Sequence, residues 1–150
     1  MAYLTYLASV PQAEIVALKA DPAPLLTPSL TVAVSHLIAY WVQVQPLGQL
    51  LGQAIDGGTV INSALQHPLR DPCYHELLVV NSLYAKLGEA WQQATAMESV
   101  AEDDWYRIEI EKVLRVFRHA AEHGECVVSV LQAPADEERA DRVRIPFATP

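Results

Sequence analysis

The stretch "VFRHAAEHGECVVSVLQ" at residues 116–132 joins the end of a helix to a strand, and this junction decides the fold class. Gly124 is typical of a helix stop, because glycine readily adopts the left-handed backbone conformation that ends many helices. The β-branched run at residues 125–132 predicts a strand, and the aromatic and aliphatic run at residues 2–10 predicts another. Helices packed on a small sheet formed by these N-terminal and C-terminal strands give an α+β fold that is mainly helical.

The helix before Gly124 is expected to begin near Ser99, because Glu102 three residues later completes a capping-box pattern. The apolar residues recur at helical spacing and predict an inward face made of Ile110, Val113, Leu114, Phe117 and Ala121. The opposite face predicts a solvated charged stripe in which Glu111 can meet Arg115 four residues on, namely Arg107, Glu111, Arg115, Arg118 and Glu122.

Two further helices are expected in the first third of the chain. Residues 12–21 predict a short helix with Ile15 and Leu18 inward and Val16 as a third candidate for the inward face. Residues 30–44 are apolar nearly all round, which favours a helix through the core, although residues 30–35 alone would also suit a strand.

A third helix is predicted from Pro46, with an apolar face that ends before Gly57 and Gly58. Gly48 and Gly52 lie one turn apart in this helix. They favour the close approach of another backbone over a ligand contact, because the glycine-rich phosphate-binding patterns are absent from the sequence.

The stretch "LQHPLRDPCYHE" at residues 65–76 gathers chemically active side chains at the start of a fourth predicted helix. Asp71 is expected to be the N-cap, and Pro72 suits the first helical position because its missing N–H costs nothing there. The seam expected to face the core is Leu77, Val80, Tyr84, Leu87 and Trp91.

Neither histidine-containing cluster predicts a metal site. Cys73 and His75 would point about 200° apart on a helix, so the two side chains could not easily hold one ion. His119 and His123 have a four-residue spacing that zinc sites use, but the sequence indicates no third ligand. We therefore expect no metal and no cofactor.

Length and charge narrow the class of protein. A chain of 150 residues with 51% hydrophobic content can bury one core, which predicts a single domain over residues 1–133 and a charged, proline-containing tail over residues 134–150. A net charge of −8, with ten basic residues spread along the chain, argues against nucleic-acid binding. No apolar stretch is long enough for a membrane span, and the N-terminus lacks a signal-peptide pattern, so we expect a cytoplasmic protein with Cys73 and Cys126 reduced.

Four segments together resemble the YfbM-like bacterial family, a group described as domain of unknown function 1877. They are "MAYLTYLASV", "AIDGG" followed by Ile61, "HPLRDPCYHE" entering a helix, and "VFRHAAEHGECVVSVL". The resemblance spans residues 2–131, and it implies a compact α+β domain with no established activity or catalytic residues. The segment at residues 30–44 departs from the family, in which it usually carries acidic residues, a lysine and a tryptophan.

Two classes of function remain open. We favour a non-catalytic protein-binding or regulatory module, because the sequence shows no recognisable pairing of nucleophile and base, no metal set and no phosphate loop. In this first class an acidic surface would steer a basic partner protein, and a homodimer is also open. The same charged run also suits an ordinary solvated helix surface that serves solubility. The surface comprises Glu98, Glu102, Asp103, Asp104, Glu109 and Glu111. The alternative is a small enzyme with a polar pocket built from His36, Tyr40, Arg70, Tyr74 and His75.

Overall fold

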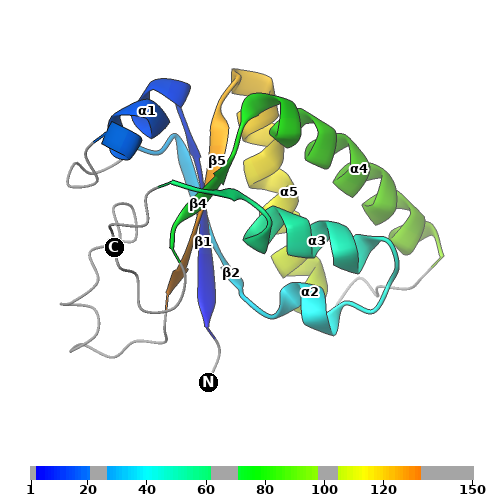
Figure 1. Ribbon diagram of the computed structural model, residues 1–150. Coiled ribbons are helices and arrows are strands. Elements are labelled where there is room, and N and C mark those ends of the chain that lie inside the picture. The colour runs from blue at the N-terminus through cyan, green and yellow to red at the C-terminus, as the bar shows by residue number, and fades with distance from the viewer. Residues whose placement is uncertain (1–2, 21–26, 62–70, 98–104, 133–150) are drawn as a thin grey trace.

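The computed structural model describes residues 3–20, 27–61, 71–97 and 105–132, which fold around one five-stranded antiparallel sheet (Figure 1). The strand order is β2-β1-β5-β4-β3. The first strand β1 (Leu4–Val10) pairs on one side with β2 (Leu30–Ser35) and on the other with β5 (Cys126–Gln132). The short strands β4 (Cys73–His75) and β3 (Thr59–Val60) complete the sheet. The predicted α+β fold with paired end strands is confirmed, in a sheet larger than the two predicted strands.

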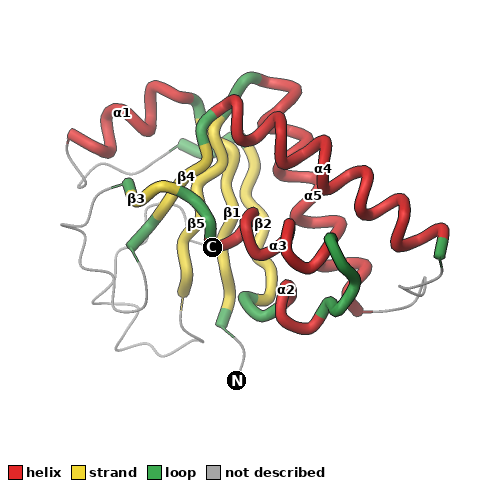
Figure 2. The backbone as a smooth tube through the Cα atoms, turned by 45° about the vertical axis from the view of Figure 1, so that its right-hand side comes forward, coloured by secondary structure: helices red, strands yellow, loops and turns green. Residues whose placement is uncertain are grey.

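Alternation along the strands gives the sheet two covered faces. On one face, Leu7 and Val127 join the main core, which packs against α3 (Leu47–Asp56), α4 (Leu77–Ala96) and α5 (Trp105–His123). On the other face, α1 (Gln12–Ala20) buries Ile15 and Leu18 against a smaller cluster, as its sequence predicted. Val16, the third candidate for the inward face, is 63% exposed, so that part of the prediction is wrong. Figure 2 shows α1 alone on its side of the sheet and the other helices together on the opposite side.

The predicted core helix over residues 30–44 is wrong. Residues 30–35 form strand β2, the alternative that their β-branched composition allowed, and only the four-residue helix α2 (Ile38–Trp41) follows. Pairing with β1 along the whole strand satisfies the backbone groups that face β1 and buries Val32 and Val34 in the main core, which outweighs helix periodicity.

The predicted N-cap at Asp71 is also wrong. The segment that was expected to open the helix forms strand β4, and α4 begins at Leu77 with Glu76 in the N-cap position. The side chain of Glu76 makes no capping hydrogen bond. Residues 73–75 pair with β5 because this adds them to an existing sheet, whereas a cap at Asp71 would leave that edge open.

The buried face of α4 is rotated slightly from the predicted seam. Val80 and Leu87 are buried as predicted, but Tyr84 and Trp91 are only partly buried at the edge of the core. Small or aliphatic side chains complete the buried face instead, namely Leu83, Ala90 and Ala94. The two aromatic rings therefore remain accessible from outside.

The last helix and its stop agree largely with the sequence. Gly124 has a φ of 64°, which confirms the predicted left-handed stop before β5. Ile110, Val113 and Phe117 are fully buried as predicted. The predicted capping pair, Ser99 and Glu102, falls outside the described residues.

A groove between α4 and α5 as the candidate binding site

A groove of about 580 Å³ runs along the outer surface where α4 and α5 lie side by side. We call it the α4–α5 groove. Its α4 wall contains Tyr84, Gly88, Trp91 and Gln92, and its α5 wall contains Ile108, Glu111, Lys112, Leu114, Arg115 and Arg118.

Aromatic and aliphatic groups form the floor of the groove. Tyr84 and Trp91 pack against the main core while still lining the groove. The guanidinium of Arg107 lies 5.2 Å from the centre of the Trp91 ring, a cation–π contact that helps to fix this ring. Ile108 is 62% exposed and adds an apolar side chain on the opposite wall.

The basic side chains of the α5 wall differ in how far they are engaged. Lys112 is held within the fold, because its Nζ lies 3.0 Å from a carboxylate oxygen of Glu109 and donates to the Ala33 carbonyl at 3.1 Å. Glu111 pairs with Arg107 at 3.5 Å, four residues before it, and not with Arg115 as its sequence spacing allowed. Within the described part of the chain, Arg115 and Arg118 are exposed and have no ion-pair or hydrogen-bond partner.

These groove residues were missed as a site in the sequence. Arg115 and Arg118 belong to the stripe that predicted only solvated surface, and Tyr84 and Trp91 belong to the seam that predicted only core. The available signal was the two aromatic residues of the α4 seam, Tyr84 and Trp91, combined with two arginines on the outer face of the next helix. Only the pairing of the two helices shows that they meet.

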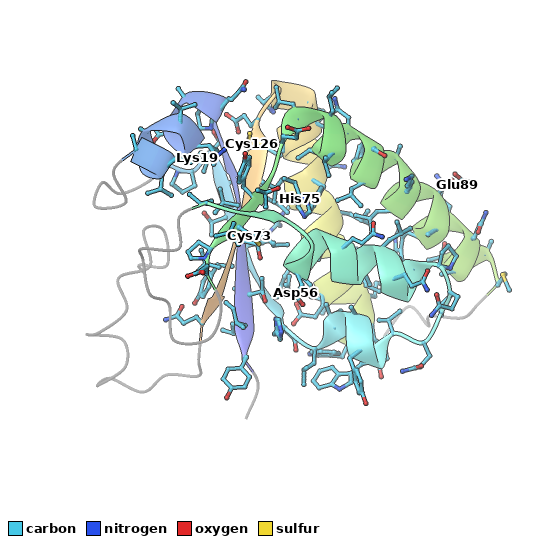
Figure 3. All side chains as sticks on the ribbon, in the orientation of Figure 1. Lys19, Asp56, Cys73, His75, Glu89 and Cys126 are labelled. Carbon is cyan, nitrogen blue, oxygen red and sulfur yellow. The ribbon has the colours of Figure 1, made fainter. Side chains whose placement is uncertain are left out.

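The residues predicted to form a polar pocket lie in separate environments. Tyr40 is 76% exposed on α2. Tyr74 lies on the α1 side of the sheet, where the Nζ of Lys19 donates to its hydroxyl at 2.5 Å. His75 points to the other side, into the main helical layer, as the positions of Lys19 and His75 show in Figure 3. Arg70 falls outside the described residues.

The two histidines of the predicted pocket are committed to structural contacts. His75 is buried, and its Nε2 lies 2.9 Å from the Gln53 carbonyl oxygen and 3.3 Å from that of Ala54, at the end of α3. Burial lowers the pKa of His75 from its ordinary value of 6.5, against the opposing effect of those two hydrogen bonds. The Nδ1 of His36 lies 2.9 Å from the hydroxyl oxygen of Thr5, a side chain with no exposed surface. Because Thr5 is buried, the ring nitrogen of His36 that contacts it is not available to a substrate.

The acidic surface predicted for a basic partner is only partly described. Glu109 is just 8% exposed and pairs with Lys112, so it lies inside the fold and not on the surface where it was expected. Glu111 does face outward, but it lines the groove beside Arg107. The other four carboxylates of this set fall outside the described residues, namely Glu98, Glu102, Asp103 and Asp104.

Strand β4 changes the geometry of the cysteine and histidine cluster. Cys73 and His75 are two residues apart on a strand and share one face, so the helix-based argument that separated them is wrong. His67 lies outside the described residues. His119 and His123 stack at 4.1 Å between ring centres, and the described residues contain no group of three His, Cys, Asp or Glu side chains that could hold a metal.

The two cysteines are buried thiols, not joined in a disulfide, on opposite faces of the sheet. Burial raises the pKa of Cys126, and the nearby carboxylates of Glu76 and Glu125 raise it further, against the opposing effect of Lys19. A raised pKa reduces the thiolate population and makes Cys126 a poor nucleophile at neutral pH.

A second polar cluster ties the ends of three strands together. The carboxylate of Glu125 accepts hydrogen bonds from Ser9 at 2.6 Å and from Ser29 at 2.8 Å, while the Nε2 of His119 lies 3.8 Å away. Both serines join the chain segments around β1 and β2 to the start of β5. This arrangement accounts for a polar residue directly after the Gly124 stop.

Comparisons of the chain with family models, with curated proteins and with solved structures found no match. The resemblance to the YfbM-like family therefore stays a prediction that rests on the four segments quoted above. Among the described helices, none is both long enough and apolar enough to cross a membrane.

Proposed function

We propose that this chain is a non-catalytic protein-binding module whose recognition surface is the α4–α5 groove. The observation that carries the proposal is the combination, in one groove, of partly exposed aromatic rings with two arginines that lack partners among the described residues. Aromatic and arginine side chains are the types that most often dominate the binding energy of protein interfaces.

The enzyme alternative has less support from the geometry. The ring nitrogen Nε2 of His75 is used by backbone carbonyls, Tyr40 is an exposed side chain on α2, and Tyr74 lies across the sheet from His75. A general base must come within hydrogen-bond reach of the proton that it removes, and these groups do not converge on one substrate position.

The groove does not suit the basic partner that the acidic stretch predicted. A basic partner was expected from the acidic stretch before and within the last helix, but Glu109 is internal and Glu111 is paired with Arg107. Within the groove, the charged side chains without a partner among the described residues are the basic ones of Arg115 and Arg118. The expected cytoplasmic location and the homodimer stay predictions.

Site-specific photo-crosslinking tests whether the groove binds a protein. A photoreactive amino acid would replace Ile108 in the groove or, as the control, Val16 on α1. Both are β-branched helical residues, with exposed fractions of 62% and 63%. In cells of the source organism, position 108 is expected to give a discrete adduct that mass spectrometry identifies as one protein, and position 16 is expected to give none.

The crosslinking result has two informative failures. Equal adducts from both positions would show non-specific contact, and no adduct at position 108 would remove the groove as a protein-binding surface. Circular dichroism spectra and melting temperatures of both variants should match those of the natural chain, so that a loss of fold is separated from a loss of binding.

A further inference from the structure

We infer that the occupant of the α4–α5 groove is an amphipathic helix with acidic side chains, supplied by a partner protein. The inference rests on the proposed function and adds the chemistry of the partner. Three properties of the groove carry it: the charge of its α5 wall, the apolar strip along its floor and the shape given by two packed helices.

The charge of the groove is opposite to that of the chain. The protein as a whole has a net charge of −8, whereas the groove is lined by three basic side chains and one acidic one. Glu111 and Lys112 are each neutralised by a neighbour, which leaves Arg115 and Arg118 as the uncompensated charges. An anionic partner is therefore attracted to this part of the surface despite the repulsion of the rest.

The two arginines are arranged to bind carboxylates. They lie three residues apart on α5, so their side chains emerge as neighbours on one side of the helix. Compensation of the helix dipole does not explain Arg118, because that effect is confined to the last turn and α5 continues to His123. Each planar guanidinium can hold a carboxylate through two parallel hydrogen bonds, which would remove the repulsion between the two like charges.

The apolar strip fixes the second property of the partner. Tyr84, Trp91 and Ile108 offer apolar surface along the groove, and Trp105 continues it at 46% exposure one turn before Ile108. From Ile108 to Arg118 the α5 wall rises by about 15 Å, or nearly three helical turns. A partner helix that matches this groove carries an apolar stripe along the face that enters it and acidic side chains placed to reach Arg115 and Arg118.

The shape of the groove favours a helix over a small molecule. Ligand sites for small molecules bury most of the ligand, but Ile108, Gln92, Arg115 and Arg118 all have exposed side chains along the rims. A long shallow channel between two packed helices suits the helix-in-groove mode, in which side chains at positions i, i+3, i+4 and i+7 enter the groove. Gly88 widens the channel, since a Cβ placed there would meet no atom within 4 Å.

Peptide binding to the full chain tests the inference. One probe is a peptide of about 18 residues with leucines at helical spacing and glutamates elsewhere, and the other has lysines in place of the glutamates. The reporter is an environment-sensitive dye on Gln92→Cys, which labels selectively because both natural cysteines are buried. The glutamate peptide is expected to change the dye emission in a saturable way, and the lysine peptide is expected not to.

Charge reversal supplies the matched control. The double variant Arg115→Glu/Arg118→Glu should weaken binding of the glutamate peptide by about tenfold or more and should create binding of the lysine peptide. Lys86→Glu, at an exposed position of α4 outside the groove lining, should leave the affinity unchanged. Higher salt should weaken the binding of the natural chain.

Three outcomes would overturn the inference. They are equal affinity for the two peptides, glutamate-peptide binding that survives charge reversal, and self-association of the natural chain that the double variant abolishes, which would make a second copy the occupant. If position 108 crosslinks a partner but the glutamate peptide does not bind, the inference of an acidic helix as the occupant is wrong. The proposed function, protein binding in the groove, is then still supported. If position 108 crosslinks nothing, the proposed function is contradicted, and the inference that rests on it is contradicted with it.

Discussion

His75 shows how one buried side chain connects the sheet to a helix end. Its ring lies 5.9 Å from that of Phe117, between centres, while its Nε2 reaches the carbonyls of Gln53 and Ala54. Ser129 on the neighbouring strand donates to the next carbonyl, that of Ile55, at 2.7 Å. The last carbonyls of a helix lack N–H partners within the helix. The Gln53 carbonyl already accepts from the Gly57 N–H at 3.0 Å, so His75 and Ser129 complete α3 from the sheet chiefly at the carbonyls of Ala54 and Ile55.

The lowered pKa of His75 predicts a loss of stability in acid. As the pH falls below the ordinary value of 6.5, the unfolded chain takes up a proton that folded His75 still rejects. The free energy of unfolding should therefore fall with pH from about 6.5 downward, by at most about 1.4 kcal/mol per pH unit for this group. Above about pH 6.5, the contribution of His75 to the free energy of unfolding does not change with pH.

Urea unfolding of the natural chain and of His75→Gln, at about pH 7.5 and about pH 5.5, checks this expectation. Glutamine can still donate to a carbonyl but does not titrate, so the variant should lose less stability in acid than the natural chain. The effects of acid that are common to both proteins cancel in the difference. Parallel stability curves would contradict the expected role of His75.

At the level of elements, the sequence correctly predicted the helices and strands whose pattern lies within their own residues. The helices at residues 12–20 and 47–56 and both end strands were found because each carries its own periodicity and stop signals. Strands β2 and β4 were mistaken for parts of helices, because their state depends on pairing with β1 and β5. The groove depends in the same way on two helices meeting, so no single segment could predict it.

Gly48 and Gly52 form a matched pair that tests how closely α3 packs against α2. A Cβ at Gly48 would lie 2.5 Å from the Val42 carbonyl oxygen, whereas one at Gly52 would make an ordinary 3.8 Å contact with the Cβ of Ala39. Gly48→Ala should reduce the free energy of unfolding by about 1–3 kcal/mol, because a backbone atom has to move. Gly52→Ala should be neutral or stabilising by up to about 1 kcal/mol.

Thermal or urea unfolding of the two alanine variants decides this expectation. If both substitutions had the same effect, close approach at Gly48 would not be what requires glycine. The close packing expected from the glycine spacing would then be unsupported at both positions.

At the scale of the whole molecule, the first and last strands of the described part of the chain pair at the centre of the sheet. β1 and β5 pair over seven residues each, although more than a hundred residues separate them in the chain. The helices and β2, β3 and β4 are then arranged around this central pair. The order of the elements along the chain therefore does not by itself predict that β5 is needed to complete the core.

This arrangement predicts a sharp boundary for truncation. A chain that ends after Ala133 keeps all of β5, so its free energy of unfolding should change by no more than about 0.5 kcal/mol. A chain that ends after Val128 loses Ser129 with its bond to Ile55, and it also loses the buried Val130 and Leu131. Each aliphatic side chain contributes about 1.5–3 kcal/mol and the hydroxyl about 1 kcal/mol, which together approach the total stability of about 5–15 kcal/mol of a typical domain. Circular dichroism and urea unfolding should show native stability for the chain that ends after Ala133 and a largely unfolded state for the chain that ends after Val128. A large loss of stability in the chain that ends after Ala133 would move the domain boundary beyond residue 133.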